Sequence, residues 1–296
     1  MAGDESTVAF EVLSNETRVE ILRSLADAFA ESPTDPFLDY SELRAAVGMR
    51  DKGNFNYPLD RLDDLLVDGP EGYAVSSVGL EVVSALASGS LNPDWTWGPV
   101  DAPGACFFCG DSLALRYENG HLRLTCDTDE HALLFPVAPR LLDSTADARG
   151  DVVERVAVSS YRQVLQLRHG ICPECQGAVT PEIAPEPKPD QGGYYFHGDC
   201  QGCGFQHGYP VGAAVLTHPD VVAACSERDI DVRTTPFWTL EWCHVGHETV
   251  VSVDPLRVRV DVQLDGETLS LTLDSGATVV STERSETARS KRSETE

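Results

Sequence analysis

The sequence predicts an α+β protein, in which an N-terminal helical unit is followed by cysteine-bearing β hairpins and a small β-rich C-terminal unit. Three observations support this class. Apolar residues recur at helical spacing through the first 90 residues, and from about residue 250 they alternate with polar ones. Between these regions, cysteines stand in Cys-x-x-Cys pairs. A length of 296 residues allows two or three domains.

The first 50 residues predict three helices. A short apolar helix ends near Leu13, and Ser14 or Asn15 can cap a second helix with apolar residues at helical spacing. A polar loop containing prolines follows it. Ser41 is predicted to cap the third helix, which Gly48 ends because glycine favours the positions after a helix.

A fourth helix is predicted over 51–67, with a turn at 68–72 that leads into a short strand at 73–75. The last helix of this region spans 77–87. The order helix, helix, turn, helix, two-stranded ribbon, helix is that of a winged helix-turn-helix domain. The domain is predicted to occupy residues 7–90.

Two motifs in this region resemble those of a known family. Residues 12–22, VLSNETRVEIL, are similar to the LSNETRxxIL opening of ArsR-like regulators, and 54–62, NFNYPLDRL, resemble the FNYHLDKL recognition helix of haloarchaeal members. The resemblance implies a homodimer that reads a pseudo-palindromic DNA site. Pro58 replaces the usual histidine, so we expect the helix to begin late enough to place Pro58 in its first turn.

The presumed recognition helix gathers cations and amides that suit double-stranded DNA. Arginine and lysine can neutralise phosphates, and asparagine can read adenine in the major groove. The candidate DNA-binding residues are Arg50, Lys52, Asn54, Asn56, Tyr57 and Arg61. Residues 1–90 nevertheless carry 17 acidic and 6 basic residues. Their repulsion from the DNA phosphates is unscreened at low salt, so non-specific DNA affinity should be weak there. The alternative is a winged helix that contacts another protein.

Two cysteine pairs in the middle of the chain predict a zinc ribbon. They are Cys172-Pro-Glu-Cys175 and Cys200-Gln-Gly-Cys203. Thiolates two residues apart can face one tetrahedral ion, and a second pair closes the site. Four thiolates leave no position for water, so this zinc would be structural. Redox-active cysteines or disulfides are the alternative, which a matched double pair fits less well.

A second ribbon is predicted over 105–140. Cys106-Phe-Phe-Cys109 supplies one pair of thiols, and Asn119-Gly120 marks a hairpin turn whose second strand runs into Cys126. Three thiolates would thus converge. The alternative is a ribbon that has lost its metal and is held together by its apolar hairpin.

The fourth ligand of this ribbon is not a cysteine. A cysteine would be expected at position 129, where Asp129 stands instead. His131 is the preferred ligand because zinc binds imidazole readily, and Asp129 is the alternative. We therefore expect two structural Zn²⁺ ions per chain.

The remaining segments predict a linker and a second, larger ribbon unit over 147–282. Residues 91–104 read as a linker because they are rich in proline and glycine, and 147–168 read as a helix. Residues 185–190 are expected to form an exposed proline-rich loop. Strands are predicted over 194–197, 237–242, 250–253, 256–264 and 268–273. A disordered tail is predicted over 283–296.

The composition is strongly acidic. The net charge is −26, from 48 acidic and 22 basic residues, and only three of the basic residues are lysines. Such a composition resembles that of halophilic archaeal proteins, where high ionic strength screens the self-repulsion. No apolar run of membrane length and no signal peptide are present, so a cytoplasmic location is expected.

The other cysteines and histidines give weaker signals. Cys225 and Cys243 are expected to be small buried apolar residues. The cluster Cys243-His244-x-x-His247 could bind metal, but surface histidines explain its spacing equally well. No phosphate loop, His-Glu-x-x-His or Gly-x-Ser-x-Gly motif occurs, which favours a protein that is not an enzyme.

Taken together, these patterns predict a sequence-specific, DNA-binding transcriptional regulator with structural zinc sites. The alternative is a protein-interaction scaffold, whose zinc ribbons bind a partner and whose winged helix serves dimerisation or docking.

Overall fold

The computed structural model describes residues 14–128, 131–143, 149–187 and 192–286. The chain divides into two compact units. The N-terminal unit contains Met1–Pro93 with Ala138–Arg140, and the C-terminal unit contains Asp94–Val137 with Leu141–Glu296. Within the described residues, no helix is long and apolar enough to span a bilayer.

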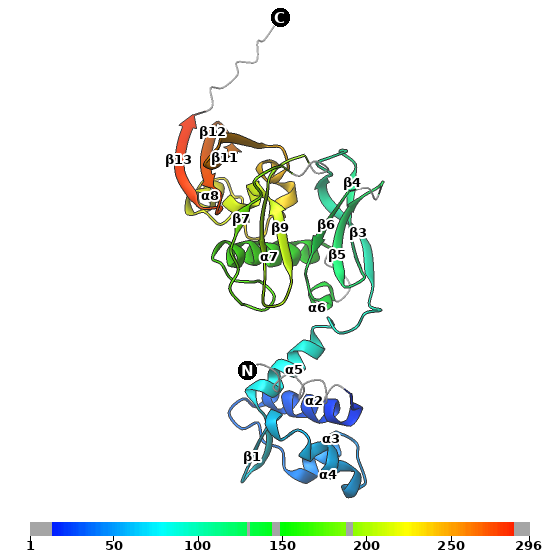
Figure 1. Cartoon of the computed structure of the whole chain (residues 1–296). Helices are drawn as coiled ribbons and strands as arrows, with labels where there is room; N and C mark the ends of the chain where they lie inside the picture. Colours follow the sequence, from blue (N-terminus) through cyan, green and yellow to red (C-terminus); the bar gives the residue numbers. More distant parts are fainter. Residues whose placement is uncertain (1–13, 129–130, 144–148, 188–191, 287–296) are drawn as a thin grey trace, which may run out of the picture. The chain divides into compact units, whose positions relative to one another are not determined.

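The helices α2, α3, α4 and α5 of the N-terminal unit each begin at a polar cap (Figure 1). Helix α2 (Glu16–Glu31) starts after Asn15, whose side-chain oxygen accepts a hydrogen bond from the Arg18 N–H at 3.1 Å. Helix α3 (Tyr40–Ala46) is capped by Asp39 and not by Ser41 as the sequence predicted. Asp39 and Glu42 form a capping box, which moves the start of α3 toward the N-terminus. The predicted helix near Leu13 lies outside the described residues.

Helix α4 (Lys52–Asp60) is shorter than the predicted 51–67. Asp51 caps it by accepting hydrogen bonds from the Gly53 and Asn54 N–H groups. The expectation that Pro58 lies in the first turn is therefore wrong, because the helix begins at Lys52 and Pro58 stands near its end. A proline there removes one backbone hydrogen bond, and the Pro58 ring is buried.

A 3₁₀ turn (η1, Asp63–Leu65) follows and leads into the hairpin of β1 (Leu66–Gly69) and β2 (Gly72–Val75). Leu38, which precedes α3, bridges to Tyr73 of β2. Helix α5 (Ser77–Ala87) has the predicted bounds and begins at Ser76, whose hydroxyl accepts from the Gly79 N–H. The apolar core of this unit contains Ile21, Leu22, Leu25, Leu43, Phe55, Leu59, Leu62, Leu65 and Val75.

The C-terminal unit opens with an antiparallel sheet in sequential order. Its strands are β3 (Trp97–Ala105), β4 (Ser112–Glu118), β5 (His121–Cys126) and β6 (Ala132–Phe135). Asn119 and Gly120 both have positive φ, which confirms the predicted hairpin turn. The predicted linker over 91–104 is wrong from Trp97 onward, because β3 pairs with β4 despite its prolines. Its pairing register shifts twice, and β3 is an edge strand, where proline is tolerated.

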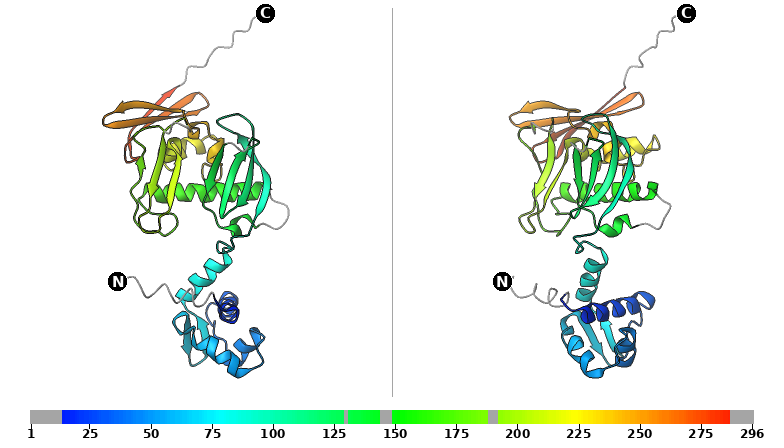
Figure 2. Two further views of the ribbon diagram at one scale, coloured as in Figure 1. Left: turned by 45° about the vertical axis from the view of Figure 1, so that its right-hand side comes forward. Right: turned by 90° about the vertical axis from the view of Figure 1, so that its right-hand side faces the viewer.

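Helix α7 (Arg149–Arg168) confirms the predicted helix over its described part, and it follows the short helix α6 (Pro139–Leu142). A three-stranded sheet comes next, formed by β7 (Glu182–Ile183), β8 (Tyr195–Asp199) and β9 (Gln206–Pro210). Figures 1 and 2 show α7 lying along this sheet and the β3–β6 sheet. The predicted proline-rich loop at 185–190 is exposed over 185–187, and its other residues lie outside the described part.

The last third of the chain contains short helical turns, helix α8 and a second four-stranded antiparallel sheet. The turns and helix are η2 (Val211–Val215), α8 (Pro219–Ser226), η3 (Phe237–Thr239) and η4 (Glu241–Cys243). The strands are β10 (Glu248–Val253), β11 (Leu256–Leu264), β12 (Glu267–Asp274) and β13 (Val279–Glu286). Residues 237–242 were predicted to be a strand, which is wrong, because these residues form the η3 and η4 turns.

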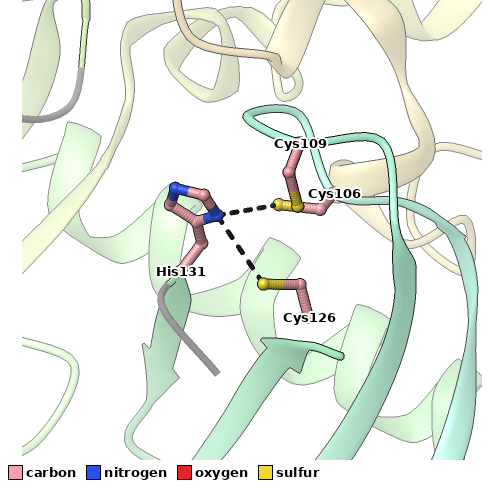
Figure 3. A group of neighbouring side chains, drawn as sticks. All are labelled: Cys106, Cys109, Cys126 and His131. Atoms are coloured by element: carbon pink, nitrogen blue, oxygen red, sulfur yellow. Dashed lines mark hydrogen bonds between the residues drawn. The ribbon is translucent and has the colours of Figure 1, made fainter. Parts of the chain in front are cut away.

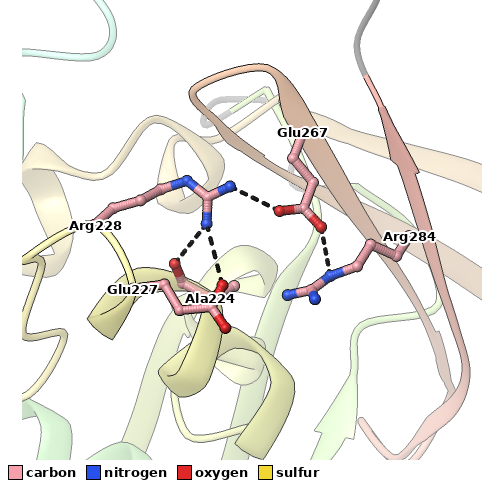
Figure 4. Close-up of polar contacts among 5 residues, drawn as sticks. All are labelled: Ala224, Glu227, Arg228, Glu267 and Arg284. Atoms are coloured by element: carbon pink, nitrogen blue, oxygen red, sulfur yellow. Dashed lines mark hydrogen bonds and ion pairs between the residues drawn. The ribbon is translucent and has the colours of Figure 1, made fainter.

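The predicted disordered tail over 283–296 is wrong at its start, because β13 continues to Glu286 and pairs with β12. The other residues of that tail, 287–296, lie outside the described part. Glu267 of β12 helps to hold β13 in place (Figure 4). Its carboxylate pairs with Arg284 of β13 and with Arg228, which follows α8, at 2.7 Å.

One apolar core runs through the whole C-terminal unit. Trp238 is fully buried in it and donates its indole N–H to the Pro103 carbonyl of β3 at 3.1 Å. Trp95 packs edge-on against Tyr117 of β4. The sequence predicted separate units at 105–140 and 147–282, but their side chains share this core and do not form two independent ones.

Candidate metal centres and nucleic-acid interface

The three Cys-x-x-Cys turns, here called knuckles, have the same backbone structure. In each, the N–H of the first cysteine donates to the carbonyl five residues later, which joins Cys106 to Asp111, Cys172 to Gly177, and Cys200 to Phe205 at 2.8–2.9 Å. The N–H of the fifth residue returns to the carbonyl of the first cysteine at 2.8–2.9 Å. This fifth residue has a positive φ in all three knuckles: 78° at Gly110, 60° at Gln176 and 75° at Gly204.

Two groups of side chains could each hold a metal ion, and they are numbered by their order in the sequence. The second metal group consists of Cys172, Cys175, Cys200 and Cys203. The knuckle of Cys172 follows α7, and the knuckle of Cys200 forms the turn between β8 and β9. All four sulfur atoms lie within 4.8 Å of one another. Cys172 and Cys203 have their sulfurs 3.7 Å apart, and Cys175 and Cys200 have theirs 3.5 Å apart. The structure thus brings together the complete predicted set, and the group could hold one metal ion.

The first metal group consists of Cys106, Cys109, Cys126 and His131 (Figure 3). Its knuckle lies between β3 and β4, Cys126 ends β5, and His131 directly precedes β6. The Nδ1 atom of His131 is 3.6 Å from the sulfurs of Cys106 and of Cys126. The preferred ligand set is therefore assembled around one point, and the alternative ligand Asp129 lies outside the described residues.

His131 takes the place of a cysteine within a fourth, incomplete knuckle. The Cys126 N–H donates to the His131 carbonyl, five residues on, at 3.3 Å. This is the same bond as in the three complete knuckles. One bond of the knuckle is thus present, and the ligand stands at the sixth residue and not at the fourth. Phe108 stacks on the His131 ring with 4.7 Å between centroids, which fixes the orientation of the imidazole.

The thiols within each group influence one another's ionisation. N–H groups of Cys203 and Gly202 lower the pKa of the Cys200 thiol to about 6. The pKa of Cys203 rises to about 12, because desolvation and the neighbouring thiols outweigh a hydrogen bond from the Phe205 N–H. The Cys200 thiol is therefore the more acidic of the two. A bound cation would reduce this difference, because it stabilises several thiolates at once.

The first metal group shows the same division. A hydrogen bond from the Thr128 hydroxyl, 3.1 Å away, lowers the pKa of the Cys126 thiol to about 6. The pKa of Cys109 rises to about 12, because desolvation and the nearby thiols outweigh a hydrogen bond from the Asp111 N–H. In both groups, one thiol therefore ionises more readily than its neighbours.

His207 contacts the second metal group and was not identified from the sequence. It is a buried residue of β9, and its Nε2 lies 3.8 Å from the Cys172 sulfur. An imidazole N–H at this position can donate to a metal-bound thiolate. Its place four residues after Cys203, facing inward on a strand that leaves the knuckle, is the sequence signal that could have identified it.

The remaining cysteines do not join either metal group. All nine cysteines are in the described residues and none is in a disulfide. Cys225 and Cys243 are fully buried, as predicted, and burial raises the pKa of both thiols. The cluster of Cys243, His244 and His247 is not among the groups whose ligand atoms converge in the described part of the chain. His244 lies 3.0 Å from the Trp238 carbonyl and stacks on Phe107.

The predicted DNA-binding residues lie on or beside α4, and all are exposed. They are Arg50, Lys52, Asn54, Asn56, Tyr57 and Arg61. Phe55, Pro58 and Leu59 form the opposite, buried side of the helix. The structure places the guanidinium of Arg61 over the Tyr57 ring, 5.4 Å from its centroid. The Arg18 guanidinium lies 6.0 Å from the same centroid. The exposed side of α4 is thus polar, cationic and aromatic.

Contacts from α3 position two of these residues. The Tyr40 hydroxyl donates to the Asn56 side-chain oxygen at 2.5 Å, and Arg44 donates to the Arg50 carbonyl at 3.0 Å. Acidic residues lie among the cations, since Asp51 caps α4 and Asp60 ends it. The electrostatic field at this surface is therefore mixed, although three cations of the chain lie within twelve positions.

Two family matches divide the chain close to the boundary of its units. Residues 6–86 match the family described as Domain of unknown function (DUF7347), and residues 103–279 match Domain of unknown function (DUF7351). No curated protein matches the chain. The second match spans both metal groups and covers more than half of the 296 residues. The protein is therefore a member of the family of the Domain of unknown function DUF7351.

Proposed function

We propose that the protein is a sequence-specific DNA-binding transcriptional regulator whose C-terminal unit is stabilised by two structural zinc ions. The exposed side of α4, with its cations, amides and aromatic ring, carries this proposal. The order of elements supports a winged helix-turn-helix with α4 as its recognition helix. This order is α2, the Leu38 bridge, α3, α4, the β1–β2 hairpin and α5.

The residues of α4 divide into two roles. Arg50, Lys52 and Arg61 suit contacts to phosphates, which position a protein on the duplex. Asn54 and Asn56 suit the edge of adenine in the major groove. Tyr57 is 58% exposed, and it supports the Arg61 guanidinium through a cation–π contact.

The distances within the metal groups support zinc. Tetrahedral zinc with bonds of about 2.3 Å to sulfur and about 2.0 Å to nitrogen separates two sulfurs by about 3.8 Å, and a sulfur from a nitrogen by about 3.5 Å. Two sulfur pairs of the second metal group are 3.5 and 3.7 Å apart, and two sulfur–nitrogen distances of the first are 3.6 Å. A disulfide would need about 2.05 Å. Four protein ligands in each group leave no open position for a substrate, which favours a structural role.

A homodimer is part of this proposal. Recognition helices of this type commonly read two half-sites related by two-fold symmetry. Helix α5 supports a dimer contact, because its sequence SVGLEVVSALA has one charged residue and Val78 is 59% exposed. Such a segment is unusual in a chain with a net charge of −26.

A selection of bound DNA followed by a salt series with the full-length chain tests the proposal. We expect the protein to enrich a pseudo-palindromic sequence and to bind it in molar potassium chloride. Replacing Arg50, Lys52 or Arg61 by alanine should weaken binding to all sequences and reduce the salt slope by about 1 each. Asn54→Ala or Asn56→Ala should instead relax the preferred sequence, with a loss of about 1–3 kcal/mol.

The matched control is Arg23→Ala, which removes an exposed arginine of α2 that pairs with Glu20. It should leave DNA binding unchanged. The competing function is a protein-interaction scaffold, which the acidic residues beside the α4 cations favour. Absence of DNA binding at every salt concentration, with the chain folded, would reject the regulator and leave the scaffold.

A further inference from the structure

The buried residue Gln163 of α7 connects the strands that leave the two metal groups. Its side-chain N–H donates to the Pro136 carbonyl at 2.8 Å, directly after β6. Its side-chain oxygen accepts from the Tyr209 hydroxyl of β9, also at 2.8 Å. Gln163 is 1% exposed and Tyr209 is 5% exposed, so water does not compete effectively for either bond.

Each of these strands follows a metal ligand in the chain. Strand β6 starts directly after His131, and Pro136 follows its last residue. Strand β9 starts three residues after Cys203, and its inward side chains are His207 and Tyr209. His207 contacts the sulfur of Cys172. A short, continuous path of contacts thus links the ligands of the first metal group, through Gln163, to those of the second.

An aromatic contact runs beside this polar one. Phe237 packs against Phe135 of β6, with 6.0 Å between ring centroids, and against Tyr209 of β9, with 5.8 Å. Any shift of β6 that breaks the bond to Gln163 must therefore also disturb the packing of β9. Well-packed side chains transmit such shifts because the core has few voids to absorb them.

We propose that the two metal groups bind metal cooperatively and that Gln163 is the positioning residue that couples them. A metal ion in one group orders the strand that follows its ligand. That strand then holds its hydrogen-bonding group, the Pro136 carbonyl or the Tyr209 hydroxyl, against Gln163. Gln163 in turn orders the strand of the other metal group. By linkage, each ion then raises the affinity for the other by the same factor. This inference depends on the metal binding proposed above, but not on DNA binding.

Cobalt(II) titration of the full-length, metal-free, reduced chain tests the coupling. Tetrahedral Co²⁺ absorbs in the visible range, and its spectrum distinguishes four sulfur ligands from three sulfurs and one nitrogen. In the unaltered protein we expect both spectra to rise together. Cys126→Ser, which disables the first metal group, should lower the Co²⁺ affinity of the second on the order of tenfold.

Gln163→Leu should abolish this difference, so that the second metal group binds equally well with or without Cys126→Ser. Tyr209→Phe removes one hydroxyl and keeps the packing, so it provides a second test in case Gln163→Leu does not fold. The matched control is Ser160→Ala, which removes another buried hydrogen bond of α7, from the Ser160 hydroxyl to the Val156 carbonyl. It should leave the coupling intact.

The outcomes separate this inference from the metal proposal itself. If Cys126→Ser leaves the affinity of the second metal group unchanged, the coupling is wrong although the chain binds metal. If Gln163→Leu and Tyr209→Phe both retain the tenfold difference, Gln163 does not carry the coupling. If the unaltered chain shows neither spectrum, metal binding fails and the coupling fails with it.

Discussion

At the scale of single residues, the three knuckles have the same backbone structure but differ in the residue at their fifth position. Gly110 and Gly204 occupy the positive-φ position in two of them, and Gln176 occupies it in the third. A residue with a Cβ atom pays about 1–2 kcal/mol in this region, whereas glycine does not. The knuckle that contains Gln176 is therefore the strained one.

We predict opposite effects of exchanging the residue types. Gly204→Ala should lower the free energy of unfolding of the metal-loaded protein by about 1 kcal/mol, because the new Cβ would meet no atom within 4 Å and only backbone strain remains. Gln176→Gly should raise it by about 0.5–1 kcal/mol, because the relief of about 1–2 kcal/mol of backbone strain exceeds the entropic cost of glycine. Urea denaturation measures both. Gly208→Ala, at a β9 glycine without positive φ, is the control and should not destabilise.

At the scale of elements, polar strand β13 depends on its neighbours more than on a core of its own. All but one of its residues are exposed. Its backbone pairs with β12, and Arg284 pairs with Glu267. Glu267 is shielded between two arginines and is 18% exposed, so its interactions are less screened than those of a surface pair.

Glu267→Gln is expected to lower the free energy of unfolding by about 1–2 kcal/mol, since hydrogen bonds from two guanidinium groups lose their charged acceptor. Amide exchange in β13 should increase first. Glu227→Gln is the matched control, because Glu227 is 62% exposed and lies 3.8 Å from Arg228. Its effect should stay within about 0.5 kcal/mol. Equal effects of both changes would contradict the role of Glu267.

Helices and strands were predicted correctly from the sequence where a local residue pattern determines them. The predictions failed where packing against distant parts of the chain determines the structure. Helices α5 and α7 follow from apolar spacing, and the second metal group follows from the ligand spacing of its cysteines. Strand β3 was missed because proline and glycine suggest a linker, yet an edge strand with register shifts tolerates them. Apolar and polar residues alternate in the η3 and η4 turns as they would in a strand. The core around Trp238 nevertheless buries the apolar side chains of these turns without any strand pairing.

The polar contacts of the site could not be predicted either. Gln163 and Thr128 are common residue types without a diagnostic spacing, and the only sequence signal for His207 is its place four residues after Cys203. Their roles arise from positions that are fixed only after α7, β5 and β9 have packed. His131 was predicted from the preference of zinc for imidazole, and the structure places its ring beside the three cysteines although it stands two residues beyond the usual ligand position. The six candidate DNA contacts are exposed, but their role stays a prediction.

At the scale of the whole molecule, the two units have different sources of stability. The N-terminal unit has an apolar core that contains no cysteine. The core of the C-terminal unit is bordered by both metal groups, and Cys106, Cys126 and the strand after His131 are part of it. A structural zinc ion supplies on the order of 10 kcal/mol to the fold that holds it.

We therefore predict that chelation destabilises the C-terminal unit and leaves the stability of the N-terminal unit unchanged. Elemental analysis of the purified chain should give about two zinc ions before chelation, from the two four-ligand groups. Residue-resolved hydrogen exchange should show loss of protection beyond residue 94 alone. Cys203→Ser should have a similar effect, whereas Cys225→Ala, at a buried thiol outside both groups, should retain both ions. Full protection after complete zinc removal would contradict a structural role.

The positions of the tryptophans give this protein a natural optical probe. All four, at positions 95, 97, 238 and 242, belong to the C-terminal unit, and none occurs in residues 1–93. Indole emission excited at the red edge, where tyrosine does not absorb, therefore reports on one half of the chain alone. Comparing it with far-ultraviolet dichroism, to which both halves contribute, would resolve their separate melting in one unlabelled sample.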